Sequence, residues 1–267
     1  MPTCVVVGGS GVMGQAAIQA YREFYSADAR IVANWYAKSP SDEPVAGADV
    51  TIFGDITSED CMQEIEKAAG KSFDHLFYAT ALGAVGFPIQ DSTPEQIAQS
   101  NQLSFDPMPV LEKRFDIGTI VGYSTFYKTR HQLGSYGAMG YSKEAIEKWT
   151  LEKGKSRRAC IRAGLFESFS SRGIKLLLRK TARDTKTLPD PLIQSYFEGV
   201  TTSEGVEKFL QGIVTEEREL FGDSPTQPEN LKNAHLELFK AESPAFVNVC
   251  GAKIWLSEEA QLLDSPA

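Results

Sequence analysis

The strongest constraint on the fold of this chain is the alternation of short apolar runs with helical patterns along most of its length. The apolar runs are rich in β-branched residues and end at turn-forming residues, as buried strands do. They cover residues 3–7, 30–35, 50–53, 75–79, 119–123, 158–163 and 245–249. Helical patterns lie between them over 15–24, 58–69, 94–115 and 137–152. Strands that are apolar throughout and are followed by helices indicate an α/β fold, a doubly wound parallel sheet with helices on both faces.

The chain is expected to form a single domain over residues 1–267, because one α/β domain commonly has this length. Two segments break the alternation. Residues 168–200 carry many basic side chains and are expected to be an insertion. Residues 215–243 are charged, contain Pro225 and Pro228, and are expected to be irregular. Neither segment has enough apolar residues to bury a core of its own.

Composition excludes several classes of protein. With 27 basic and 35 acidic residues the net charge is −8, which argues against a nucleic-acid partner or an anionic membrane surface. A hydrophobic fraction of 42% excludes disorder as the overall state. No apolar run reaches the roughly 18 residues of a membrane-spanning helix, and the start MPTCVVVGGSG lacks the basic region of a signal peptide.

Cysteine and histidine usage narrows the chemistry. The cysteines are scattered without a CxxC pair, which indicates free structural thiols in a reducing compartment and predicts a cytoplasmic protein: Cys4, Cys61, Cys160 and Cys250. His75, His131 and His235 have no metal-binding spacing, so no metal site is expected. The chemistry therefore has to come from hydroxyls, amines, carboxylates or a bound cofactor.

The first expected strand and helix are joined by a glycine-rich loop, Gly8-Gly9-Ser10-Gly11-Val12-Met13-Gly14. It fits both the G-x-G-x-x-G and the G-x-x-G-x-x-G spacing of dinucleotide-binding loops, in the strand–loop–helix context that the motif needs. Glycines let the backbone approach a diphosphate at a helix N-terminus, where the helix dipole favours negative charge. The loop therefore predicts a Rossmann-type domain that binds the cofactor through Gly8, Ser10, Gly11, Val12, Met13 and Gly14.

The end of the second expected strand usually selects the cofactor. An Asp or Glu there would bind both ribose hydroxyls and favour NAD. This chain has Asn34 instead, and Lys38 with Ser39 follows, where a 2′-phosphate would lie. The sequence favours NADP, with NAD as the alternative, since Lys38 is equally compatible with a solvated loop.

An ordered set of landmarks over residues 3–168 resembles the short-chain dehydrogenase/reductase family. After the glycine loop come Gly54-Asp55-Ile56-Thr57, Ala79-Thr80-Ala81, Asn101, Ser124, Lys143, and Arg162-Ala163-Gly164 with Ser168. The resemblance implies cofactor contacts from Asp55, Ile56, Ala79, Thr80, Ala81, Lys143, Gly164 and Ser168. It also implies that Ser124 donates to the substrate oxygen and that Asn101 orders a water near Lys143. A helix cap for Asp55 and a surface amide for Asn101 are the alternatives.

One position departs from the common family pattern. The residue four before Lys143 is Met139 rather than tyrosine, and the chain offers Tyr136-x6-Lys143 instead. That spacing is similar to the enoyl-thioester reductase branch, and it puts both residues on nearly one face of a helix. A phenol with a pKa near 10 is a poor acid at pH 7 unless a neighbouring ammonium assists it. The resemblance implies that Lys143 also holds the nicotinamide ribose and that Tyr136 is the proton donor. Taken singly, an ordinary helix aromatic and a solvated lysine are the alternatives.

These patterns favour an NAD(P)H-dependent reductase that transfers hydride to a carbonyl or to a conjugated enone or enoyl group of a small molecule. One alternative is a nucleotide-binding protein without redox turnover, acting as a sensor or partner-binding protein. Another is an isomerase or cyclase built on the same fold. The family resemblance implies a homodimer or homotetramer, and it identifies 168–200 as the substrate loop.

Overall fold

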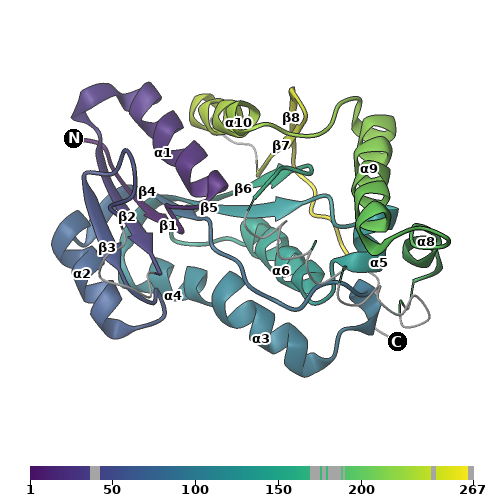
Figure 1. Ribbon diagram of the computed structural model, residues 1–267. Coiled ribbons are helices and arrows are strands. Elements are labelled where there is room, and N and C mark those ends of the chain that lie inside the picture. The colour runs from purple at the N-terminus through teal and green to yellow at the C-terminus, as the bar shows by residue number, and fades with distance from the viewer. Residues whose placement is uncertain are drawn as a thin grey trace.

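The computed structural model describes residues 1–36, 43–168, 175, 179, 188, 190–241 and 245–263. Its strands form one eight-stranded sheet in the order β3-β2-β1-β4-β5-β6-β7-β8 (Figure 1). The strands are β1 (Thr3–Val7), β2 (Arg30–Trp35), β3 (Val50–Phe53), β4 (Ser72–Tyr78), β5 (Asp116–Thr125), β6 (Arg157–Ala163), β7 (Phe246–Cys250) and β8 (Lys253–Ser257). All neighbouring pairs are parallel except β7 and β8. The predicted parallel α/β sheet is confirmed.

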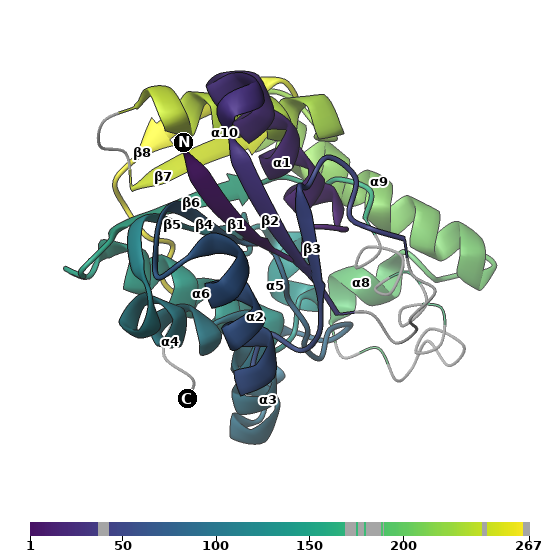
Figure 2. The ribbon, with the colours of Figure 1, turned by 90° about the vertical axis from the view of Figure 1, so that its left-hand side faces the viewer.

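Helices cover both faces of this sheet (Figure 2). Helices α1 (Val12–Tyr25) and α10 (Pro228–Lys240) pack together on one face. The other face carries α2 (Glu59–Ala69), α3 (Pro94–Ser104), α4 (Pro107–Arg114) and α6 (Met139–Leu151). Within the described residues, no helix is long and apolar enough to cross a membrane.

The strand order places a potential binding crevice at one edge of the sheet. From β1 the chain passes to β2 and β3 on one side, and β4 then returns to pair with β1 on its other side. Connections that run in opposite directions from neighbouring strands leave a gap beyond the carboxyl ends of those strands. The loops after β1 and β4 therefore flank the crevice in which a ligand of this fold class binds.

Local sequence explains why the predicted helix 94–115 is two helices. Thr93 and Gln96 form a capping box at the start of α3. Pro107 is the first residue of α4, where its missing N–H has no helical partner to lose and its fixed φ suits a helix start. The helical pattern was right, and the prolines begin a new helix rather than distort the first one.

The prediction that residues 215–243 are irregular is wrong. The segment contains the end of α9 (Thr202–Phe221) and all of α10. Pro228 is the first residue of α10, so it initiates that helix, and Gly222 ends α9 in the left-handed conformation. Leu231, Ala234 and Leu238 of α10 are fully buried in the core on the α1 face.

The predicted insertion at 168–200 lies largely outside the described residues. Its described end includes α8 (Pro191–Ser195), which begins after the N-cap residue Asp190. Together α8 and α9 enclose a small apolar cluster separate from the two cores that flank the sheet. Its buried members are Leu188, Ile193, Phe197, Val206, Phe209 and Ile213.

The four cysteines are free and buried, as predicted for structural thiols. Cys4 and Cys160 lie inside the central strands β1 and β6. Burial raises the pKa of both thiols above its ordinary value, so neither is an activated nucleophile.

Candidate active site

A cavity of about 750 Å³ opens at the carboxyl edge of the sheet, between the loops after β1, β2, β3 and β4. Predicted cofactor residues on its wall are Gly8, Ser10, Gly11, Asp55, Ile56, Ala79, Thr80 and Ala81. Its remaining wall is made by Asn34, Trp35, Tyr36, Thr57, Leu82, Gln99, Gln102 and Leu103. Residues that the sequence places in four separate loops therefore surround one space.

The glycine loop folds tightly enough to bring the start of α1 to this cavity. The N–H groups of Gly8 and Gly9 both donate to the carbonyl of Asn34, each over 3.0 Å. Gly8 has φ +77°, a conformation that favours glycine. A Cβ on Gly14 would lie 2.3 Å from the carbonyl oxygen of Gly8, so the third glycine is required for the packing of helix on loop.

The N-terminus of α1 is suited to an anion. Among the described residues, no acceptor faces the N–H groups of Val12, Met13 and Gly14. The first turn of α1 has no acidic residue, and its N-cap Gly11 has no capping side chain. A diphosphate would satisfy these donors and complement the helix dipole. The predicted residues thus fit the diphosphate of a dinucleotide, and the buried side chain of Met13 leaves only its backbone for that contact.

Two alanine substitutions in the loop separate binding from packing. Gly14→Ala is expected to lower the melting temperature by about 5 °C, because the new methyl group overlaps the Gly8 carbonyl. Gly11→Ala meets that carbonyl only at an ordinary 3.4 Å, so the fold should survive. Gly11 lies on the cavity wall, so an added methyl group should weaken NADPH binding about tenfold. Calorimetry and fluorescence titration would measure both effects, and unchanged NADPH affinity in Gly11→Ala would contradict the assigned site.

The cavity wall includes several residues that sequence reasoning missed. Trp35 is the last residue of β2 and Tyr36 follows it, so the strand end that was examined for a carboxylate does line the cavity, with two aromatic residues. Gln99, Gln102 and Leu103 come from α3, and only tertiary packing shows that this helix forms a wall.

The predicted Asp55 and Ile56 contacts lie on the turn after β3. One oxygen of Asp55 accepts from the N–H and the hydroxyl of Thr57, at 2.9 and 2.7 Å. The following residue, Ser58, is the N-cap of α2 and bonds the N–H of Cys61. Asp55 therefore orders the turn and lies on the cavity wall, while the cap of α2 is Ser58 rather than Asp55. The cofactor contact of Asp55 stays a prediction.

Several predicted cofactor residues are not on the cavity wall, and among those that the structure describes they are Val12, Met13, Gly14, Lys143, Gly164 and Ser168. Lys38 and Ser39 lie outside the described residues, so the NADP preference stays a prediction. Gly164 follows β6, and its N–H donates to the carbonyl of Val249 over 2.8 Å. Ser168 ends the same described segment. Both lie beyond the carboxyl end of β6.

Lys143 is a buried cation near the same edge of the sheet. Its side chain comes from α6, is 7% exposed, and donates from Nζ to the carbonyl oxygen of Tyr123 over 3.0 Å. That carbonyl lies beyond Val121, the last residue of β5 that pairs with β4. Burial lowers the pKa of Lys143 to about 8, with Cys160 and Glu147 opposing the shift.

Tyr136 ends the short helix α5 (Arg130–Ser135) as its C-cap residue. Burial raises the pKa of its phenol to about 12. Its hydroxyl forms no hydrogen bond with any residue that the structure describes, Lys143 included. The predicted pair is thus present on adjoining elements, and the direct contact between phenol and ammonium is absent.

The loop after β4 fixes the backbone around Tyr136. Phe87 and Tyr136 form a parallel bridge, and the N–H groups of Gly137 and Ala138 donate to Phe87 and Ala84 over 3.0 Å each. A Cβ on Gly137 would lie 2.5 Å from the Ala84 carbonyl oxygen, which explains the glycine there.

Met139, at the position of the common family tyrosine, faces α3 instead of the cavity. Its sulfur lies 3.5 Å from the Ser100 hydroxyl. Asn101 accepts a hydrogen bond from Ser142 over 2.8 Å and makes no contact with Lys143 among those the structure describes. The role of Asn101 in ordering a water near Lys143 stays a prediction. Helix periodicity alone did not show which face of α3 meets α6.

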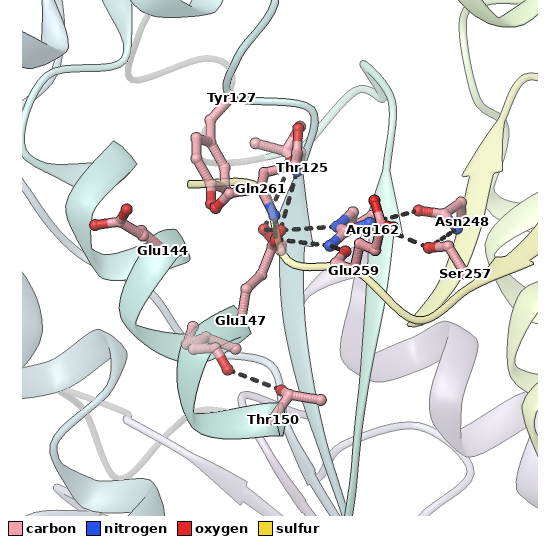
Figure 3. A network of polar contacts seen from close by, with 12 residues as sticks. Thr125, Tyr127, Glu144, Glu147, Thr150, Arg162, Asn248, Ser257, Glu259 and Gln261 are labelled. Atoms are coloured by element: carbon pink, nitrogen blue, oxygen red, sulfur yellow. Dashed lines mark hydrogen bonds and ion pairs between the residues drawn. The ribbon is translucent and has the colours of Figure 1, made fainter. Parts of the chain in front are cut away.

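Ser124 is likewise engaged elsewhere. Its hydroxyl donates to Glu147 over 2.6 Å, and Glu147 forms a buried ion pair with Arg162 at 2.7 Å. Figure 3 shows Glu147 of α6 facing Arg162 of β6, with Gln261 of the C-terminal segment beside them. Because side chains alternate along β5, residue 124 is directed to the α6 face. Ser124 is not the free donor to substrate that the resemblance implied.

Solved structures share the fold of this protein over nearly the whole chain. A short-chain dehydrogenase family protein from Francisella tularensis superposes with TM-score 0.61 at 19% identity, covering 94% of this chain and 98% of that one. The KRED1-Pglu enzyme superposes with TM-score 0.58 at 15% identity, covering 91% and 97%. The fold is that of the short-chain dehydrogenases/reductases.

Sequence comparison adds no closer relative to this fold. No protein-family model matches the chain, and no curated protein matches it. A third structure with the short-chain dehydrogenase/reductase fold, from Shigella flexneri 2a, was crystallised with NADP. It superposes with TM-score 0.50 at 16% identity and covers 65% of this chain and 81% of that one.

Proposed function

We propose that this chain is an NAD(P)H-dependent reductase of the short-chain dehydrogenase/reductase type. Its substrate is a small molecule with a carbonyl or a conjugated carbon–carbon double bond. The observation that carries the proposal is the buried Lys143, held at the carboxyl edge of a sheet whose adjacent cavity fits a dinucleotide. A lysine with no carboxylate within salt-bridge distance among the described residues is costly to bury, which argues for a role beyond packing.

Each proposed role follows from side-chain chemistry. The reduced nicotinamide would supply a hydride to the substrate. The Lys143 ammonium would hold the ribose hydroxyls and lower the pKa of a nearby phenol. Tyr136 would donate a proton or hydrogen bond to the oxygen on which negative charge develops. Its hydroxyl is free to do so, because it has no partner among the described residues.

The cofactor proposed is NADP, with NAD as the alternative. Asn34 lies at the end of β2, where a carboxylate would favour NAD, and its side-chain amide donates to the carbonyl of Gly54. Lys38 and Ser39 follow in the sequence and would meet a 2′-phosphate. The NADP-bound structure from Shigella flexneri shows that the shared fold accommodates this dinucleotide. We also propose a cytoplasmic homodimer or homotetramer, in line with the free cysteines and the family resemblance.

Removing the Tyr136 hydroxyl tests this function. Tyr136→Phe is expected to lower kcat about 100-fold with any accepted ketone or enone, because it removes the proton donor and leaves the ring in place. NADPH affinity should change less than about twofold. Nicotinamide absorbance with a panel of ketones and enones would measure turnover. Tyr141→Phe, on α6, is the matched control and should behave as the parent. Parental kcat in Tyr136→Phe would contradict the assigned role.

A second candidate is a nucleotide-binding protein without redox turnover. The loop after β4 is hydrogen-bonded to residues 135–138, and a Cβ on Gly83 would lie 2.8 Å from the Met139 sulfur. The cavity wall includes neither Tyr136 nor Lys143. A site limited to the adenosine end would bind 2′-phospho-ADP-ribose as tightly as NADPH, whereas the reductase should bind NADPH more tightly. Competition titration between the two ligands distinguishes the candidates.

A further inference from the structure

Helix α5 connects the candidate active site to a separate part of the molecule. It lies beside α8 and α9 at one end of the structure (Figure 1) and contacts both. Its last turn leads directly into Tyr136, whose N–H donates to the carbonyl of Gln132 over 2.8 Å. The backbone of Tyr136 is therefore attached to a helix that contacts both α8 and α9.

One link between these elements is a bidentate ion pair. The guanidinium of Arg130 donates to both oxygens of Asp190, at 2.9 and 3.1 Å. The same carboxylate caps α8 by accepting from the N–H of Ile193 over 3.1 Å. A Cβ on Gly134 would lie 2.9 Å from the Asp190 carboxyl carbon, so the α5 backbone approaches closely here. The planar fork of arginine fixes both distance and orientation.

The second link is a chain of three polar side chains, Glu216–His131–Tyr196. His131 is 7% exposed; its Nδ1 bonds Glu216 of α9, and its Nε2 lies 2.7 Å from the hydroxyl of Tyr196. Glu216 also accepts from the N–H groups of Arg130 and His131, so it caps α5. A Cβ on Gly212 would lie 2.3 Å from the Tyr196 oxygen, which explains why α9 has a glycine here.

Helices α8 and α9 do not need these polar contacts to pack against each other. Helices α8 and α9 already bury Ile193, Phe197 and Phe209 in their own apolar cluster. The polar links instead join that cluster to α5, and buried or half-buried charged hydrogen bonds impose more specific geometry than apolar contacts do. We infer that two sets of polar contacts, Arg130–Asp190 and Glu216–His131–Tyr196, together position Tyr136. We call them the α5 latch, because they couple the positions of α8 and α9 to the position of Tyr136 at the end of α5.

This inference rests on the proposed function, in which Tyr136 is the proton donor. Glu216→Ala removes the cap of α5 and the partner of His131 together, while Glu216→Gln keeps an acceptor. Tyr196→Phe removes only the hydroxyl that bonds His131, at the end of the Glu216–His131–Tyr196 series. Glu219→Ala, an exposed change one turn further along α9, is the matched control.

The latch is tested by two readouts on the full chain. Amide hydrogen exchange at Tyr136, Gly137 and Ala138 should become about tenfold faster in Glu216→Ala, less so in Glu216→Gln and Tyr196→Phe, and stay parental in Glu219→Ala. In the same order kcat should fall, by about tenfold for Glu216→Ala, with NADPH affinity unchanged within about twofold.

The outcomes distinguish a positioning role of the latch from a purely structural one. They also distinguish failure of the latch inference from failure of the proposed reductase function. Parental exchange at 136–138 together with a lower melting temperature would overturn the inference, because the links would then only stabilise α9. Faster exchange at 136–138 supports the latch even if the parent protein turns over no substrate. A parent protein that turns over no substrate would instead count against the proposed function.

Discussion

Replacing Lys143 with methionine is expected to lower kcat/KM for the reduction at least about 100-fold and, at the same time, to stabilise the protein at pH 7. The side chain is 7% exposed, and its one hydrogen bond among the described residues is to the Tyr123 carbonyl. Methionine has a similar length and no charge to desolvate. A residue that costs stability and is required for activity is typical of functional sites rather than of the core.

The size and pH dependence of the stability gain follow from the pKa of Lys143. Burial lowers this pKa from 10.5 to about 8 in the native state. Below pH 8 the lysine is charged in both states, so the native state bears the whole net cost of the buried charge, about 3 kcal/mol by linkage. Between pH 8 and 10.5 the native state releases its proton first, so parental stability rises with pH. Losing the hydrogen bond to Tyr123 offsets about 1 kcal/mol, which leaves a net gain of about 2 kcal/mol for Lys143→Met at pH 7.

Urea unfolding at pH 7 and pH 9.5 measures this gain, which should shrink at the higher pH. In activity, Lys143→Met should lose at least about 100-fold in kcat/KM for the reduction, since the ammonium positions the cofactor and assists Tyr136. Parental kcat/KM should itself fall as pH rises through about 8, where the ammonium loses its proton. Lys148→Met, an exposed lysine on the same helix, is the control. Lower stability at pH 7 with parental activity would show that Lys143 is structural.

Breaking the buried ion pair between Glu147 and Arg162 is expected to have the largest effect on stability. Glu147 is fully buried and accepts from Arg162 twice, at 2.9 and 2.7 Å, from Ser124, and from the backbone and side chain of Gln261. Arg162 also bonds Asn248 and stacks over the Phe246 ring at 3.9 Å. Figure 3 shows that this network joins α6, β6, β7 and the C-terminal segment.

Either Glu147→Gln or Arg162→Met leaves one buried charge without its partner. Each should therefore destabilise the native state by about 4 kcal/mol and lower the melting temperature by about 10 °C. The double variant Glu147→Leu/Arg162→Met removes both charges and should lose less than either single change.

Glu64→Gln is the surface control, because Glu64 and Lys67 form an exposed ion pair on α2. It should change stability by less than about 0.5 kcal/mol. Differential scanning calorimetry on all four variants measures these effects. A loss from Glu147→Gln as small as that from Glu64→Gln would mean that the buried pair does not hold the C-terminal segment in place.

The sequence predicted those elements of the fold that depend on the residues within each element. The continuous apolar runs gave seven strands, and all seven are present, with β6 and β7 beginning one residue from the predicted start. Strand β8 was missed because Lys253–Ser257 is short and half-exposed, so it shows no buried run. Helix α10 was not predicted because the segment is charged and contains Pro225 and Pro228, although proline is favoured at the first position of a helix.

In the candidate site, too, the sequence predicted the parts that are contiguous in the chain and not the contacts between distant segments. The glycine loop was predictable because its spacing, strand and helix are contiguous in the chain. The contacts of Ser124 and Asn101 were not predictable, because they depend on which face of β5 or α3 meets α6. Their partners, Glu147 and Ser142, lie far along the chain. The aromatic wall at Trp35 and Tyr36 and the α5 latch depend on tertiary contacts that no local pattern reports.

A structure of the protein with bound NADPH tests the central claim most directly. The reductase account predicts that the diphosphate lies at the N–H groups of Val12 to Gly14 and that the Lys143 ammonium bonds the nicotinamide ribose. It also predicts the Tyr136 hydroxyl beside the nicotinamide ring. A complex in which only the adenosine half is ordered, with Tyr136 and Lys143 remote from the ring, would contradict hydride transfer at this site.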